Sequence, residues 1–202
     1  MLKQLIAGMA ATVALAFAAV AKPVNDQPAP SFSGVTITGE VINLSDFRGQ
    51  PVVLEWTNHE CPYVRKHYGS GNMQKTQRAL TEAGAVWVSI ISSAPGEQGY
   101  VNAAEAQRLT AERGVYADHV VLDPEGLIGR AYEAKTTPHM FLIDKEGVLK
   151  YQGAIDDKPS ANPRSLEGAT NHVLAAWAEF ADGKQISMAQ TKPYGCSVKY
   201  AE

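Results

Sequence analysis

Short apolar segments rich in β-branched and aromatic residues recur along this chain, and polar or amphipathic stretches separate them. The segments are residues 51–56, 85–92, 119–122, 140–143 and 148–153. Runs of this length and content, bounded by turn residues, are typical of buried strands. Helix-length stretches lie between most of them, and this alternation predicts an α/β fold.

The order of these elements also predicts how the sheet is built. Helices are expected from Pro62 onward and at 73–83, 101–113, 123–134 and 165–181. Strands that alternate with helices pair in parallel, whereas the tight turn at 144–147 joins the last two strands as a hairpin. We therefore expect a central mixed sheet, mostly parallel with an antiparallel edge, flanked by helices on both faces.

The first 21 residues have the features of a secretory signal peptide. Lys3 precedes an apolar run over 5–20, which ends in the small-residue pattern Ala19-Val20-Ala21. The alternative is a permanent membrane anchor, but the run is Ala-rich and shorter than the roughly 20 residues that span a bilayer. We expect removal of 1–21, with no stable membrane insertion afterwards. The remaining 22–202 then form one periplasmic or secreted domain with an irregular C-terminal tail from about 182.

Charge and motif content exclude several classes of function. The net charge is −3 and 19% of the residues are charged, which does not favour a nucleic-acid surface. The sequence contains no Gly-rich phosphate loop and no other cofactor motif, so no cofactor is predicted. Two cysteines, Cys61 and Cys196, are too few for a disulfide scaffold, and in an exported protein they can form one structural bridge or do redox chemistry.

Cys61 lies between a predicted buried strand and a predicted helix that starts with Pro62. A thiol at a helix N-terminus meets unpaired N–H groups and the positive end of the helix dipole, which favour the thiolate. Arg65 and Lys66 on the next turn favour it further, whereas Glu60 opposes it by like-charge repulsion. The alternative is an inert buried cysteine, which a polar strand-to-helix turn disfavours.

Thr137-Pro138 stands directly before a predicted strand. A proline at the first position of a strand is compatible with sheet pairing, and a cis bond there would be a deliberate feature. The sequence leaves open whether the bond is cis or trans.

Two segments carry a resemblance to a known family. Residues 56–64, Trp-Thr-Asn-His-Glu-Cys-Pro-Tyr-Val, and residues 137–144, Thr-Pro-His-Met-Phe-Leu-Ile-Asp, resemble the thioredoxin-like superfamily, in particular its peroxiredoxin-like (redoxin) branch. The resemblance covers roughly 28–185 and implies a thioredoxin-like fold. It also implies that Cys61 is the nucleophile and that Pro138 is a cis-proline facing it, with Thr137 as a contact to the substrate backbone. The implied partners are a thiol or disulfide protein substrate and a reductant.

The sequence departs from the family patterns at two points. Val64 stands where the second cysteine of Cys-x-x-Cys would be. The peroxidatic pattern Pro-x-x-x-Thr-x-x-Cys is also absent, because Thr57 lies four residues before Cys61 and Leu54 replaces the proline. Cys196 can replace the missing thiol, since its Gly-Cys-Ser segment resembles the C-terminal motif of this branch. The pair is then either a reversible catalytic couple or a permanent bridge.

These observations favour an exported thiol–disulfide oxidoreductase with Cys61 as nucleophile and Cys196 as resolving thiol. One alternative is a thiol peroxidase in which Cys61 is oxidised to sulfenic acid. The other is a non-catalytic partner-binding or metal-binding module. In the metal-binding version, His59 and His139 would join Cys61 as ligands for copper or zinc.

Overall fold

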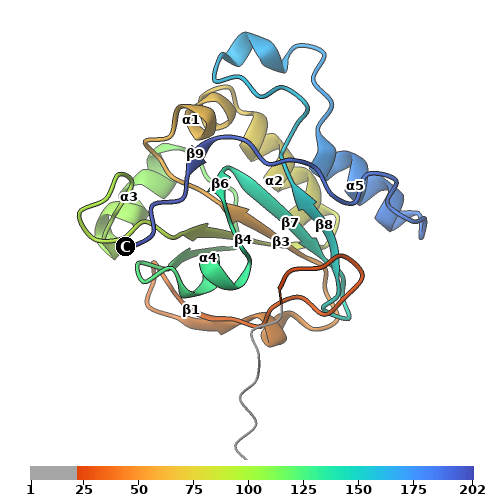
Figure 1. Ribbon diagram of the computed structural model, residues 1–202, viewed down its shortest axis with the longest axis horizontal. Coiled ribbons are helices and arrows are strands. Elements are labelled where there is room, and N and C mark those ends of the chain that lie inside the picture. Colours follow the sequence, from red (N-terminus) through yellow and green to blue (C-terminus); the bar gives the residue numbers. More distant parts are fainter. Residues whose placement is uncertain (1–21) are drawn as a thin grey trace, which may run out of the picture.

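The computed structural model describes residues 22–202, so the predicted signal peptide at 1–21 lies outside the described residues. A seven-stranded sheet forms the centre, in the order β2-β1-β5-β4-β3-β7-β8 (Figure 1). Its strands are β1 (Ser33–Thr36), β2 (Val41–Asn43), β3 (Val52–Trp56), β4 (Val86–Ile91), β5 (His119–Leu122), β7 (His139–Ile143) and β8 (Leu149–Gly153). Two further strands, β6 (Thr136–Thr137) and β9 (Cys196–Ser197), pair with each other outside this sheet.

Helices connect and cover the strands. The α-helices are α1 (Pro62–Gly69), α2 (Asn72–Glu82), α3 (Ala103–Glu112), α4 (Leu127–Ala131) and α5 (His172–Ala181). Two 3₁₀ helices lie at Leu44–Phe47 and Pro163–Leu166. In this part of the chain, no helix is both long and apolar enough to cross a bilayer. The predicted α/β class with a central mixed sheet is confirmed.

The continuous apolar runs of the sequence became the central strands because these strands are covered on both faces. Every residue of β3 and β7 is buried, and Leu54 of β3 lies between Val88 of β4 and Phe141 of β7. Side chains alternate between the two faces of a strand. Val53 and Glu55 therefore face one side of the sheet, and Leu54 and Trp56 the other.

The expectation of a mostly parallel sheet is wrong. Within residues 22–202, only the β3–β4 and β4–β5 pairs of the large sheet are parallel, and its other neighbours are antiparallel. The N-terminal hairpin adds to β5 in the antiparallel sense through Val35 and Leu122, so both edges of the sheet are antiparallel. Hydrophobic periodicity identifies strands but does not give the direction in which they pair.

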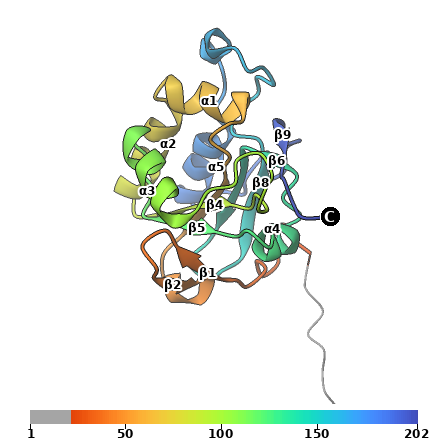
Figure 2. The ribbon, with the colours of Figure 1, turned by 90° about the vertical axis from the view of Figure 1, so that its left-hand side faces the viewer.

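The helices cover the two faces unequally. Helices α1, α2 and α5 pack on the face of Val53, in a core that includes Cys61 and Trp87. The short helix α4 and the first 3₁₀ helix cover the face of Trp56. Figure 2 shows α1, α2, α3 and α5 together on one side of the sheet and α4 on the other. The nucleophile candidate thus belongs to the more heavily covered side.

The helix expected at 165–181 is shorter than predicted. A 3₁₀ turn at Pro163–Leu166 ends before Gly168, whose φ of +66° is incompatible with a continuing helix. Asn171 then caps α5, and its side chain accepts a hydrogen bond from the Leu174 N–H. A glycine and a capping asparagine therefore divide the stretch into two elements.

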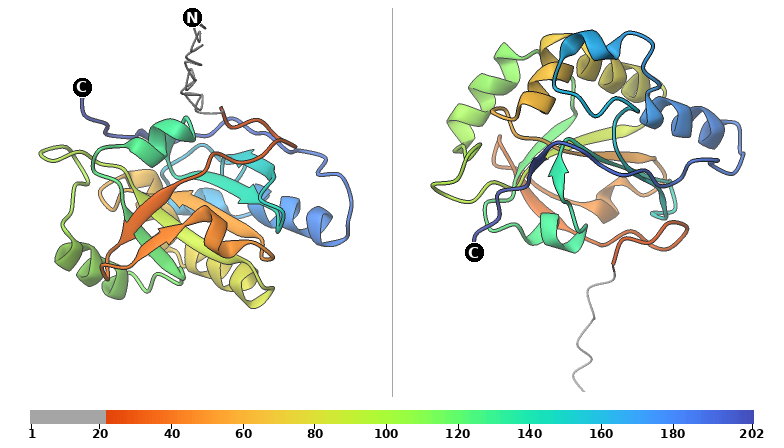
Figure 3. Two further views of the ribbon diagram at one scale, coloured as in Figure 1. Left: turned by 90° about the horizontal axis from the view of Figure 1, so that it is seen from below. Right: turned by 45° about the horizontal axis from the view of Figure 1, so that its top comes forward.

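The C-terminal tail is more ordered than its irregular sequence suggested. From the end of α5 it runs across the molecule, passes β6 and ends beside α4 (Figure 3). Backbone hydrogen bonds join Thr191 to Gln152 and Val198 to Lys135 along this path. Near its end, the Tyr200 hydroxyl donates to the Ala134 carbonyl at 2.8 Å. The tail therefore lies across the protein as a strap held on both sides of Cys196.

Candidate functional site

Cys61 occupies the N-cap of α1, directly after β3 and a short turn. Its N–H donates to the Asn58 carbonyl at 3.1 Å, and its own carbonyl accepts from the Arg65 N–H at 2.9 Å as the helix starts. Pro62 takes the first helical position, where its missing N–H costs nothing. Because β3 is buried and α1 packs on the sheet, the Cys61 side chain is 0% exposed.

The surroundings of the Cys61 sulfur favour its charged form. Burial raises the pKa of Cys61, but hydrogen bonds from the Cys196 thiol and from the Val64 backbone N–H outweigh this effect. The pKa of Cys61 therefore lies below that of an ordinary cysteine, as the sequence argument from the helix N-terminus predicted.

Cys196 lies beside Cys61 on the strap. It sits in β9, where it pairs with Thr137 of β6, and it packs partly buried against the core that contains Cys61. Both cysteines are free thiols. Burial, together with its hydrogen bond to Cys61 and repulsion from the Cys61 thiolate, raises the pKa of Cys196 to about 12. Because Cys61 and not Cys196 lies at the N-terminus of a helix, Cys61 is the thiol that ionises more easily of the two.

Thr137 and Pro138 join the two cysteines. The Thr137–Pro138 peptide bond is cis, which the sequence left open. The Cys61 thiol donates to the Thr137 carbonyl at 3.1 Å, and the same residue pairs with Cys196. A Cβ on residue 195 would lie 2.0 Å from the Thr137 carbonyl oxygen, and the φ of Gly195 is +142°. Only glycine therefore permits the tail to come this close to Thr137.

The charged residues suggested as tuning groups make other contacts. The Glu60 carboxylate accepts from the Gly99 N–H at 2.7 Å. Arg65 borders a groove between α1 and α3. Lys66 turns into the protein and bonds to Asp156. The lowered pKa of Cys61 is instead explained by Cys196 and by the Val64 N–H at the start of α1.

The histidines proposed as metal ligands have separate surroundings. His139 is buried against Phe141, and its Nδ1 accepts from the Lys135 N–H at 3.3 Å. Burial and the Lys135 charge lower the pKa of His139 to about 3, so it is neutral. His59 borders the groove between α1 and α3. Over residues 22–202, no three His, Cys, Asp or Glu side chains gather as a metal site would require.

Two clusters of buried polar side chains near the site were not predicted from the sequence. The Glu55 carboxylate lies on the Cys61 side of β3 and accepts hydrogen bonds from Tyr68, Gln77, Trp87 and Ser89. Burial raises its pKa despite these donors. Glu55 is the one acidic residue in an otherwise apolar strand, and this pattern in the sequence could have indicated a buried carboxylate with hydrogen-bond donors around it.

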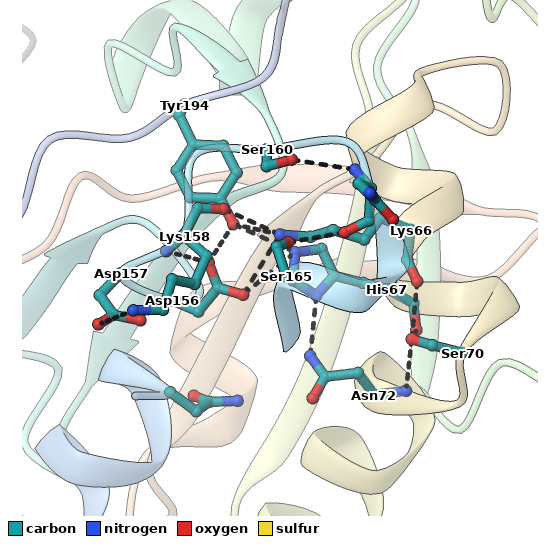
Figure 4. A network of polar contacts seen from close by, with 12 residues as sticks. Lys66, His67, Ser70, Asn72, Asp156, Asp157, Lys158, Ser160, Ser165 and Tyr194 are labelled. Atoms are coloured by element: carbon teal, nitrogen blue, oxygen red, sulfur yellow. Dashed lines mark hydrogen bonds and ion pairs between the residues drawn. The ribbon is translucent and has the colours of Figure 1, made fainter. Parts of the chain in front are cut away.

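The second group joins α1 to the tail. It contains Lys66, His67, Asp156 and Tyr194, which come from three distant parts of the chain (Figure 4). Only the position of Tyr194, two residues before Cys196, gave a hint of it in the sequence.

The sheet, the cis-proline and the cysteine at the start of α1 define a thioredoxin-like protein of the redoxin branch, as the motifs predicted. The model of the AhpC/TSA family matches residues 25–152, and the chain belongs to this family.

Individual proteins are similar to this chain in sequence or in fold. The thioredoxin-like protein YneN of Bacillus subtilis is 28% identical over 125 residues, which cover 61% of this chain and 68% of that protein. An uncharacterised conserved protein from Geobacillus kaustophilus superposes with a TM-score of 0.76 at 22% identity, covering 89% and 93% of the two chains. A candidate thiol:disulfide interchange protein, DsbE, from Chlorobium tepidum gives 0.51 at 28% identity, covering 64% and 84%.

The pKa difference between the two thiols predicts a difference in their pH profiles. Iodoacetamide labelling of Cys61 should rise with a midpoint below that of an ordinary cysteine, because the pKa of Cys61 is lowered. Labelling of Cys196 should require a higher pH, because its pKa is raised. Mass spectrometry of the two labelled peptides from one sample measures both, each serving as the control for the other. Labelling of Cys196 at the lower pH would contradict the assignment.

Proposed function

We propose that this protein is an exported thiol–disulfide oxidoreductase in which Cys61 is the nucleophile and Cys196 the resolving thiol. The observation that carries the proposal is the pairing of Cys196 with Thr137, which places the tail thiol against the core that contains Cys61. The names of the Bacillus and Chlorobium relatives support the class of reaction. The signal-peptide pattern of 1–21 supports export.

The first step is the attack of the Cys61 thiolate on a disulfide of the substrate. The Cys61 sulfur forms a bond to one substrate sulfur, and the second substrate sulfur leaves as a thiolate. The N-terminus of α1 and the Val64 N–H stabilise the attacking charge beforehand. Thr136 and Thr137 form a strand edge beside the Cys61 sulfur, and the tail pairs with this edge in the structure. The substrate backbone would pair with the same edge when the tail is displaced.

The second step exchanges the roles of the two thiols. Once Cys61 is bonded to substrate, its negative charge is gone, and with it the repulsion that helps to raise the pKa of Cys196. The nearby Lys199 also favours ionisation of Cys196. The Cys196 thiolate then attacks the Cys61 sulfur, forms the Cys61–Cys196 disulfide and releases the substrate thiolate, which takes up a proton. A dithiol protein that itself becomes oxidised would return the pair to the reduced state.

A redox titration of residues 22–202 tests whether the pair is catalytic. We expect reversible formation of the Cys61–Cys196 bond with a potential between about −120 and −270 mV, the range of catalytic disulfides. Quenching with an alkylating reagent and mass spectrometry reports the fraction oxidised. A bond that resists reduction below about −300 mV would be structural and would contradict the proposal. Consumption of peroxide in a parallel stopped-flow assay separates this function from a thiol peroxidase.

A further inference from the structure

The Tyr194 hydroxyl is held in a socket of buried polar side chains (Figure 4). Lys66 Nζ donates to this hydroxyl at 3.1 Å, and the hydroxyl donates to Asp156 Oδ1. The socket residues Lys66 and Asp156 lie 3.4 Å apart, and their side chains are 0% and 2% exposed. His67 Nε2 lies 3.4 Å from the same hydroxyl. A tail residue thus bonds to an ion pair that is buried within the domain.

The socket is built from parts that do not belong to the tail. Lys66 and His67 are on α1, and Asp156 follows β8. Lys66 Nζ also donates to the Lys158 carbonyl at 3.0 Å, and the Asn72 amide bonds to His67 Nδ1 at 2.8 Å. These contacts hold the side chains in place from the domain side. Removal of Tyr194 therefore empties one donor position of the ammonium group and one acceptor position of the carboxylate.

Helix α1 both carries Cys61 and binds the tail. Cys61 caps α1, and Lys66 lies on the second turn of that helix. On the tail, Tyr194 stands two residues before Cys196. The Tyr63 ring of α1 also packs edge-on against the Tyr194 ring, with the centroids 5.7 Å apart. Docking of Tyr194 thus fixes Cys196 relative to Cys61.

A docked tail has opposite consequences for the two chemical steps. Cys61 is 0% exposed with the strap in place, and Cys196 occupies the only partner strand of Thr137 within the described residues. An external disulfide can reach Cys61 only when the strap is displaced. Resolution, in contrast, requires the strap to return so that Cys196 meets Cys61.

We infer that Tyr194 is a positioning residue whose hydroxyl, bound by Lys66 and Asp156, latches the tail over Cys61 and sets the balance between attack and resolution. This inference rests on the proposed function. The latch limits access of substrate in the first step and supplies a high local concentration of the resolving thiol in the second.

The Tyr194→Phe variant tests the latch, because it removes the hydroxyl and keeps the ring that packs on Tyr63. The reduced protein is mixed with an aromatic disulfide that releases a coloured thiolate. Attack by Cys61 releases the first equivalent in a phase that depends on reagent concentration. Attack by Cys196 on the Cys61 mixed disulfide releases the second equivalent in a phase whose rate is independent of reagent concentration. We expect the variant to speed the first phase and slow the second, each by about tenfold, the size expected for loss of a hydrogen bond to charged partners.

Tyr132→Phe is the matched control. It also removes a buried hydroxyl, which donates to the Pro30 carbonyl at 2.7 Å, but Tyr132 packs in the core on the opposite face of the sheet. Its two phases should match those of the parent protein. Opposite changes in the two phases of Tyr194→Phe support the latch, since general destabilisation does not produce them.

Two results would overturn the latch, namely unchanged phases in Tyr194→Phe or phases that change in the same direction. Failure of the proposed function has a different signature. In that case the parent protein releases no coloured thiolate through Cys61, or the Cys61→Ser variant retains the first phase.

Discussion

Replacement of Cys61 by serine is expected to abolish turnover of disulfide substrates, with a loss of at least about 1,000-fold. The hydroxyl of serine is not ionised near neutral pH, so the charge stabilised by the N-terminus of α1 and the Val64 N–H is never formed. The oxygen can still donate to the Thr137 carbonyl as the thiol does, so the buried site loses no hydrogen-bond partner. Disulfide consumption with a dithiol reductant in excess measures the effect.

The fold of the Cys61→Ser variant should remain intact, because the change is nearly isosteric in a side chain that is 0% exposed. Circular dichroism and the midpoint of thermal unfolding provide this control. Retention of turnover in the folded variant would show that Cys61 is not the nucleophile. In that case Cys196 would be the nucleophile and would act without Cys61.

The sequence was sufficient to identify the central strands and the cysteine at the helix start. Strands β3 and β7 are buried on both faces, so their composition is apolar over every position except Glu55 in β3 and His139 in β7. The turn before Pro62 and the Thr137-Pro138 pair are local features that require no knowledge of distant contacts. Pairing direction was not predictable in this way, because the hairpin at the β5 edge is determined by packing between segments far apart in the chain.

The arrangement of the tail was beyond local sequence reasoning for the same reason. Strands β6 and β9 have two residues each, too few for any periodicity, and they come from parts of the chain about 60 residues apart. The socket of Tyr194 combines α1, the segment after β8 and the tail. The Gly-Cys-Ser motif indicated a second thiol that could pair with Cys61, but not that an ion pair inside the domain would hold the tail.

Replacement of Cys196 is expected to stop the reaction after the first step. Without the resolving thiol, the Cys61–substrate disulfide has no neighbouring attacker and accumulates. Both Cys196→Ser and Cys196→Ala should release one coloured equivalent from an aromatic disulfide, and the second equivalent should be lost. Intact-protein mass spectrometry should find the reagent attached to Cys61. Release of two equivalents by either variant would contradict the role of Cys196.

The two Cys196 variants also separate resolution from tuning of the Cys61 pKa. The Cys196 thiol donates to the Cys61 sulfur and lowers its pKa, and serine keeps a donor at this position whereas alanine does not. Loss of the donor raises the pKa of Cys61 in the protein with the strap in place, so less Cys61 is thiolate at neutral pH. The ultraviolet absorbance of the Cys61 thiolate should therefore titrate at higher pH in Cys196→Ala than in Cys196→Ser, with the Cys61→Ser variant as the baseline. Identical titrations would assign the stabilisation of the thiolate to the N-terminus of α1, and would leave Cys196 with resolution alone.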